Sequence, residues 1–149
     1  MNAQPVRTPD LSTRPHEITV ERVMKSPPGL LYAALTQGFD IWLAVPDSVR
    51  MTPAVREPFY FETEAEGERV PHYGRFLRLE PERTIEFTWV TRATEGAETV
   101  VTIGFVKQPR GIRLRLRHAG FPGEEAARRH GREWLALLER LDSRLSPAD

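Results

Sequence analysis

The stretch FPGEEAARRHGREWLALLERLDSRL, residues 121–145, is the longest run of the chain with a helical period. Its apolar residues recur at steps of three, four and seven: Ala127, Trp134, Leu138, Leu141 and Leu145. Charged residues fill the other side: Arg128, Arg129, Arg132, Glu133, Glu139, Arg140 and Asp142. This pattern is typical of an amphipathic helix that buries one face. We therefore expect a long C-terminal helix that covers the rest of the fold.

The chain before this helix alternates with a period of two, which predicts β-strands. Seven strands are expected, over residues 16–25, 49–55, 58–66, 70–80, 84–92, 98–107 and 111–119. Short turns rich in Gly and Pro join the later strands, and short connections favour antiparallel neighbours. Two short helices are expected after the first strand, at about residues 26–36 and 39–44. The predicted fold is α+β, a curved antiparallel seven-stranded sheet wrapped around the C-terminal helix.

The composition predicts one domain and limits the classes of partner. The chain has 149 residues, of which 1–14 are polar and aperiodic, so we expect a disordered arm followed by a single domain over 15–146. The formal net charge is zero, which argues against a nucleic-acid partner. No apolar run approaches the roughly 18 residues of a membrane span, and no signal peptide is recognisable. We expect a soluble, cytoplasmic protein.

The inward face of the predicted sheet is rich in aromatic side chains. We predict that a hydrophobic cavity between sheet and helix binds a small molecule, because such sites are mostly apolar with few polar groups. The candidate cavity-lining residues are Trp42, Phe59, Phe61, Phe87, Trp89, Phe105, Leu116, His118, Trp134 and Leu138. The alternative is that these side chains pack together as a solid core.

The sequence shows no catalytic constellation. His72 and His118 are the two groups that could act as acid, base or polar anchor, and each could equally be structural. His16 and His130 are expected at the surface. The chain has no cysteine, its four histidines lack metal-ligand spacing, and no glycine-rich phosphate loop is present, so we expect no metal and no cofactor.

Three stretches resemble a known family. They are PGLLYAALT at 28–36 with the later Trp42, GRFLRLEP at 74–81 with IEFTW at 85–89, and HAGF at 118–121 before the final helix. In this order they resemble the helix-grip superfamily of START domains and polyketide cyclases (SRPBCC), and within it the homologues of the activator of heat shock protein 90 ATPase. The resemblance implies that the first and last strands pair, which would place Glu17 and Glu21 beside Arg113, Arg115 and Arg117.

The resemblance adds three functional readings. The first is a domain that binds a small apolar or aromatic ligand beneath the long helix. The second is an enzyme of the polyketide cyclase or aromatase type, for which only His72 and His118 could serve. The third is a chaperone-regulating or protein-interaction module. A homodimer and a chaperone partner are both open.

Overall fold

The computed structural model describes residues 6–146. The strands are β1 (His16–Met24), β2 (Pro58–Ala65), β3 (Glu68–Glu80), β4 (Thr84–Trp89), β5 (Thr99–Lys107) and β6 (Ile112–Phe121). The helices are α1 (Pro28–Thr36), α2 (Phe39–Trp42) and α3 (Glu124–Leu145), with 3-10 turns at Pro46–Ser48 and Arg92–Thr94. No helix among these residues is long and apolar enough to cross a membrane.

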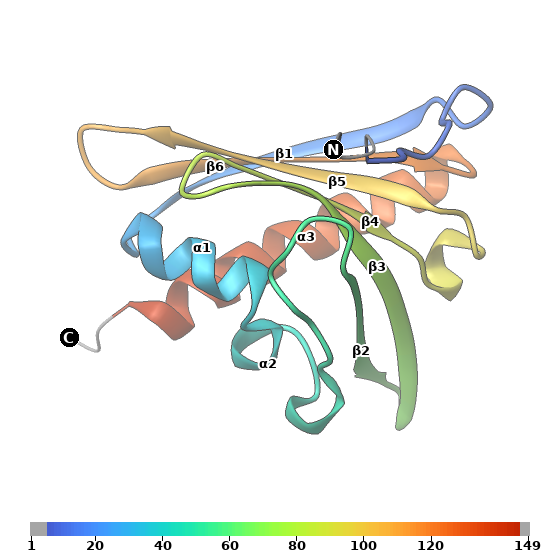
Figure 1. Ribbon diagram of the computed structural model, residues 1–149, viewed down its shortest axis with the longest axis horizontal. Coiled ribbons are helices and arrows are strands. Elements are labelled where there is room, and N and C mark those ends of the chain that lie inside the picture. The colour runs from blue at the N-terminus through green and yellow to red at the C-terminus, as the bar shows by residue number, and fades with distance from the viewer. Residues whose placement is uncertain (1–5, 147–149) are drawn as a thin grey trace, which may run out of the picture.

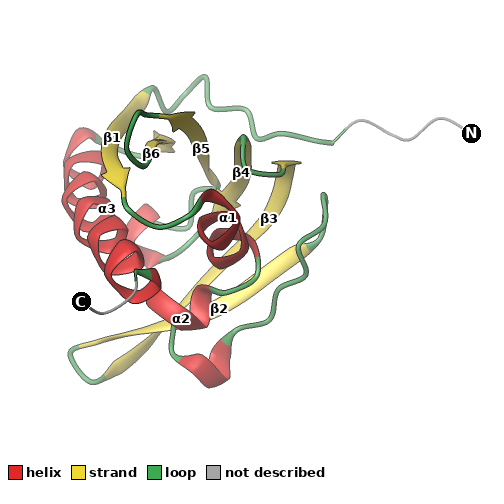
Figure 2. Cartoon of the chain, turned by 90° about the vertical axis from the view of Figure 1, so that its left-hand side faces the viewer, coloured by secondary structure: helices red, strands yellow, loops and turns green. Residues whose placement is uncertain are grey.

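The strands of the described residues form one antiparallel sheet of six strands in the order β1-β6-β5-β4-β3-β2. The sheet curls around α3, which lies across its concave side. Helices α1 and α2 lie on the same side of the sheet and contact α3 (Figures 1 and 2). This confirms an α+β fold with an open antiparallel sheet, two short helices after the first strand and a long C-terminal helix.

The prediction of seven strands was wrong. Residues 49–55 form an irregular segment, in which Arg50 makes only an isolated bridge to Tyr60. Pro53 interrupts the alternation, and Arg56 adopts a positive φ of 77° that ends any extended run. Val49 and Met51 still pack against the core, which explains why the segment has the apolar content of a strand.

Helix α3 buries the predicted stripe. Ala127, Trp134, Leu138 and Leu141 are all buried. Gly131 lies on the same face, and a Cβ atom there would lie 2.7 Å from the Ile18 side chain, so glycine allows α3 to approach β1 closely.

One charged residue of α3 was misplaced by the pattern. Asp142, which we expected on the polar face, is 2% exposed. Its Oδ1 accepts hydrogen bonds from the backbone N–H groups of Lys25 and Ser26, both at 3.0 Å, and from the Ser26 hydroxyl at 2.7 Å. Burial acts to raise the pKa of Asp142, but these donors outweigh it and the pKa is lowered. The carboxylate therefore fastens the end of α3 to the connection between β1 and α1.

The last strand alternates as predicted. Ile112, Leu114, Leu116 and His118 are buried, whereas Arg115 and Arg117 are exposed on the outer face. The Arg117 Nε donates to Glu17 at 3.0 Å, and Arg115 Nε lies 3.7 Å from Glu21 on the neighbouring β1. The expected ion pairs between the first and last strands are thus confirmed for these two arginines.

The predicted N-terminal arm falls partly outside the described residues, which begin at position 6. Positions 6–15 contain no helix or strand. The Arg14 side chain donates to the carbonyl oxygens of Gly120 and Glu98, both at 2.7 Å. Disorder of residues 1–14 and the domain limits 15–146 stay predictions.

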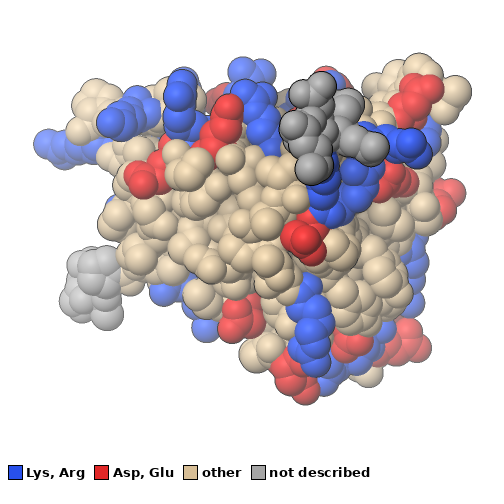
Figure 3. All heavy atoms as spheres, viewed as in Figure 1, with Lys and Arg blue, Asp and Glu red and all other residues tan. Residues whose placement is uncertain are grey.

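Charged side chains of both signs are interspersed on the face of the molecule that Figure 3 shows. Blue and red atoms lie mainly around its margins, and an uncharged area occupies the middle. On this face, no continuous basic patch of the kind that nucleic-acid backbones require is visible.

Candidate functional site

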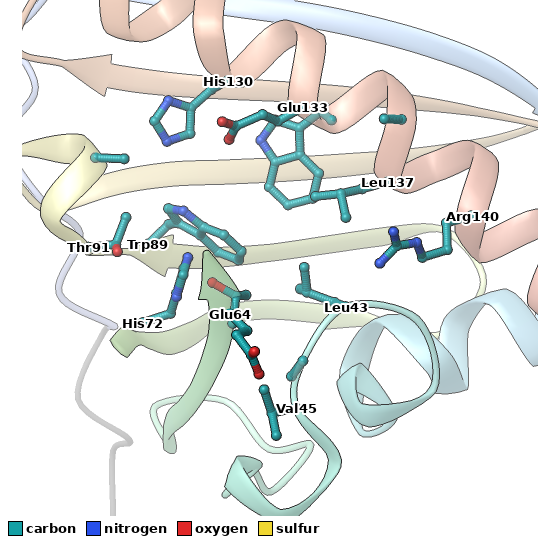
Figure 4. Close-up of a pocket in the computed structure, with 15 residues that line it drawn as sticks. Leu43, Val45, Glu64, His72, Trp89, Thr91, His130, Glu133, Leu137 and Arg140 are labelled. Carbon is teal, nitrogen blue, oxygen red and sulfur yellow. The ribbon is translucent and has the colours of Figure 1, made fainter. Parts of the chain in front are cut away.

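A pocket of about 520 Å³ opens between α3 and the β2–β3 hairpin. The hairpin curves away from the helix, and side chains from both fill the walls without closing the space (Figures 1 and 4). The lining residues are Leu43, Ala44, Val45, Thr63, Glu64, His72, Trp89, Thr91, Ala93, His130, Glu133, Trp134, Ala136, Leu137 and Arg140.

Two of the ten predicted cavity residues, Trp89 and Trp134, line this pocket. The other eight are not among its lining residues: Trp42, Phe59, Phe61, Phe87, Phe105, Leu116, His118 and Leu138. Seven of them are buried, and Phe105 is half-buried against Tyr32. A direct contact between these eight and a ligand stays a prediction that a ligand-bound structure would check.

Phe39 of α2 is buried and packs among the inward-facing aromatic side chains of the sheet. Its ring packs edge-on against Phe59, Phe61 and Phe87, with centroid distances of 5.7, 5.2 and 6.1 Å. Sequence alternation had placed those three side chains on the inward face correctly. It could not show that α2 would supply a further ring to occupy the space between them.

Two tryptophans form the aromatic wall of the pocket. Trp89 ends β4 and Trp134 lies in the middle of α3, with ring centroids 5.1 Å apart and planes inclined by 54°. Both residues are almost fully buried, at 4% and 2% exposure, so only small parts of the two rings reach the pocket. Leu137, three residues after Trp134 on α3, adds to the apolar wall (Figure 4). Apolar molecules suit such a surface.

His72 lies on β3 at the inner end of the pocket. Its ring stacks on Phe61, the cross-strand neighbour, with centroids 4.6 Å apart, and meets Trp89 edge-on at 5.2 Å. The Nδ1 atom lies 3.0 Å from the carbonyl oxygen of Val70, which can only accept, so Nδ1 carries the proton. Burial lowers the pKa of His72 to about 4, and the ring is neutral at pH 7.

His130 of α3 also lines the pocket, contrary to the expectation that it would be at the surface. It is 3% exposed, and its Nδ1 donates to the carbonyl oxygen of Ala126 at 2.8 Å. Burial lowers its pKa. The signal was present in the sequence, because position 130 lies three residues after Ala127 and four before Trp134, on the same helical stripe.

His118 belongs to a closed hydrogen-bond network. The Trp134 Nε1–H donates to its Nδ1 at 2.9 Å, so the neutral ring carries its proton on Nε2 and donates it to the Thr99 hydroxyl at 2.7 Å. That hydroxyl in turn donates to the Trp89 carbonyl oxygen. Burial holds the pKa of His118 well below its usual value. Both ring nitrogens are thus engaged within the fold.

Three polar atoms of the inner pocket have no partner within the described chain: Nε2 of His72, Nε2 of His130 and Nε1 of Trp89. The only fully buried side-chain nitrogens or oxygens without a partner among residues 6–146 are Nε of Arg22 and Nε of Arg113. The three pocket atoms therefore keep accessible surface. Their three residues are at most 9% exposed, and all of them line the pocket.

The mouth of the pocket carries exposed charges. Glu64 comes from β2, and Glu133 and Arg140 come from α3 (Figure 4). Among residues 6–146, none of the three takes part in an ion pair within 4.0 Å, and no group of three or more metal-ligating side chains is assembled. The site is therefore an apolar cleft with two unprotonated histidine nitrogens inside and mixed charges outside.

The chain was compared with known families and structures. A family model described as Activator of Hsp90 ATPase homolog 1-like protein matches residues 25–146. None of the curated proteins matches the chain.

Solved structures with the same fold include protein MLL2253 of Mesorhizobium loti, at 27% identity and a TM-score of 0.73 over 90% of this chain and 99% of that one. Protein CV1439 of Chromobacterium violaceum matches at 22% identity and a TM-score of 0.76, over 90% and 100% of the two chains. CalU16 of Micromonospora echinospora matches at 22% identity and 0.67, over 88% and 76%. The last two similarities support the fold alone.

Proposed function

Because the chain belongs to the family of Activator of Hsp90 ATPase homolog 1-like proteins, we propose that it works as a binding module for a small apolar or aromatic molecule. The observation that carries the proposal is the pocket between α3 and the β2–β3 hairpin. Its volume of about 520 Å³ falls in the range of roughly 300–1,000 Å³ that is usual for small-molecule sites. Leu43, Val45 and Leu137, together with the small exposed parts of Trp89 and Trp134, would supply the apolar contact area.

The first test is native mass spectrometry of the purified protein beside its denatured mass. A discrete excess mass that is lost on denaturation would identify a bound small molecule and support the proposal. The second test titrates the uncharged fluorophore N-phenylnaphthylamine and measures its fluorescence. Saturable binding of one molecule per chain is expected.

A pair of variants in α3 distinguishes binding in the pocket from binding to other apolar surfaces. Leu137→Trp places a larger ring on the pocket wall, whereas Leu135→Trp makes the same change at an exposed position outside the pocket. Binding should be lost in the first variant and kept in the second. Equal binding by both variants, or no binding by the parent protein, would contradict the proposal.

A catalytic role of the polyketide cyclase type is a second proposal, which rests on the open Nε2 atoms of His72 and His130. A histidine whose pKa is about 4 is a weak base at neutral pH, which makes binding the better-supported reading. Turnover of a candidate substrate that survives replacement of both histidines by Gln would count against catalysis by these groups.

A chaperone partner is proposed on the family description alone. It predicts complex formation with a heat shock protein 90 ATPase that the Leu137→Trp variant retains. Light scattering of the mixed proteins would measure it, and the absence of any complex would remove the proposal.

A further inference from the structure

We infer that the pocket selects a hydroxylated aromatic molecule, a phenol, with the hydroxyl group seated at the inner end beside His72, His130 and Trp89. The inference rests on the proposed binding function and names the chemical class of its ligand. It follows from which polar atoms the fold leaves open there.

The two histidines offer acceptors only. Each donates its Nδ1 proton to a backbone carbonyl, Val70 for His72 and Ala126 for His130, so each pocket-lining ring keeps an unprotonated Nε2 that no group among residues 6–146 engages. A ligand group that meets these atoms must donate a hydrogen bond. A carboxylate or an ether oxygen has no proton to give and would place its lone pairs against those of the nitrogen.

Trp89 offers the opposite character. Its Nε1–H is a donor only and has no acceptor among residues 6–146. A group that satisfies both kinds of atom must donate and accept at once. A hydroxyl group does so with a single heavy atom, since it has one proton and two lone pairs.

The apolar walls of the pocket determine which kind of molecule can bear the hydroxyl group. Leu43, Val45 and Leu137 line the pocket beside the small exposed parts of Trp89 and Trp134, so the walls favour an apolar body. The lowered pKa values of both histidines, which have burial as their first cause, keep the two acceptors unprotonated at neutral pH. Leaving such buried polar atoms unpaired is costly, so a ligand that lacks the hydroxyl should bind distinctly more weakly.

The experiment compares matched ligands on the parent protein by isothermal titration calorimetry at neutral pH. Naphthol, methoxynaphthalene, naphthalene and naphthoate share one ring system and differ in the polar group. Naphthol should bind about tenfold more tightly than methoxynaphthalene, which matches the net worth of one buried hydrogen bond. Naphthoate should bind more weakly than naphthol. Equal affinity for naphthol and methoxynaphthalene, or tighter binding of naphthoate, would overturn the inference.

Variants of His72 and His130 test whether these residues cause the affinity difference between naphthol and methoxynaphthalene. His72→Phe keeps a ring that can stack on Phe61 but removes Nε2, so the ratio of the affinities for naphthol and methoxynaphthalene should shrink. His16→Phe, on β1 outside the pocket, is the matched control. If His72→Phe does not fold, His130→Leu removes the second acceptor and is measured in the same way. Full preference for naphthol in a folded His72→Phe or His130→Leu variant would also overturn the inference.

The failures of the two proposals are distinguishable. If none of the four ligands and no fluorophore binds, the binding function itself fails. If all four bind with similar affinity and Leu137→Trp abolishes binding, the binding function stands and the selection for a hydroxyl fails.

Discussion

His118 and His72 are both buried histidines on the inner face of one sheet, yet their surroundings differ in one respect. At His118, Trp134 donates to one ring nitrogen and Thr99 receives the proton of the other, so the network is closed. At His72, which lines the pocket, Val70 accepts the Nδ1 proton and the second nitrogen has no partner among residues 6–146. The fold itself satisfies both nitrogens of His118, whereas the proposed ligand would satisfy the second nitrogen of His72.

This difference distinguishes the two histidines better than burial does. Exposure is 0% for His118 and 9% for His72, and both pKa values are lowered by burial. What differs is the number of ring nitrogens that the fold itself satisfies. A closed network should matter to stability, and an open one should matter to binding.

The largest expected effect is on folding. His118→Ala leaves the Trp134 N–H unpaired in the core and opens a cavity, which together should lower the free energy of unfolding by about 4 kcal/mol. His72→Ala opens onto the pocket, where water can enter, and should cost about 1 kcal/mol. Urea denaturation followed by circular dichroism measures both.

A rescue variant checks the cause. His118→Gln has a carbonyl oxygen for the Trp134 N–H and an amide for Thr99, so it should recover part of the stability that His118→Ala loses. Equal losses for alanine at positions 118 and 72 would break the distinction between closed and open networks.

The second effect depends on pH. The pKa of His72 is about 4 in the folded protein and ordinarily 6.5, so the folded state binds fewer protons than the unfolded state between these values. Stability is therefore complete above pH 6.5 and falls as the pH is lowered to about 4, by about 3 kcal/mol for this group alone.

Chemical denaturation at intervals between pH 7 and pH 4 tests this expectation. His72→Gln should lose less stability over the range than the parent protein, and the difference isolates the contribution of His72 from that of His118. His16→Gln removes a half-buried histidine of β1 and is the matched control. A parallel pH dependence in His72→Gln and the parent would refute the assignment.

The sequence predicted those parts of the fold in which a period continues over many residues. The alternation of Ile112, Leu114, Leu116 and His118 and the stripe of α3 were both long enough to define a buried face, and both are confirmed. The segment 49–55 has alternating apolar residues but also Pro53, and it forms a loop in which Val49 and Met51 pack against the core although only Arg50 makes an isolated bridge. A partly buried loop can therefore have the same alternating sequence pattern as a short strand.

The pocket was less predictable because it depends on tertiary distances. Alternation identified the inward-facing aromatic residues, but not that Phe39 would fill the space among most of them. It also could not show that the β2–β3 hairpin would diverge from α3 and leave room at Trp89 and Trp134. His130 was recoverable from its helical spacing, whereas the open or closed state of each histidine required the positions of Val70, Thr99 and Ala126.

A smaller effect extends the comparison to carboxylates on α3. Asp142 is buried and accepts from Lys25, Ser26 and the Ser26 hydroxyl, whereas Glu133 is exposed at the pocket mouth. Asp142→Asn replaces one accepting oxygen by a donor and should lower the free energy of unfolding by about 2 kcal/mol. Glu133→Gln is the control and should change it by less than about 0.5 kcal/mol. Thermal unfolding of both variants measures the difference, and equal losses would contradict it.

The smallest expected effect lies on the outer face of the sheet, where charged side chains form ion pairs but remain exposed to water. Arg117 donates to Glu17 through its Nε, and the two side chains are 53% and 45% exposed. Exposed pairs of this kind contribute about 0.2–1 kcal/mol, because water solvates either partner when the other is removed. A double-mutant cycle with Arg117→Ala and Glu17→Ala should give a coupling energy in this range, and one that falls as salt is added. A coupling energy as large as the loss in His118→Ala would mean that a hydrogen-bonded partner stabilises this fold even at an exposed position. A small coupling energy would show that a partner contributes strongly only when the pair is also buried. The hydrogen bonds of His118 meet this condition, whereas the second ring nitrogen of His72 has no partner.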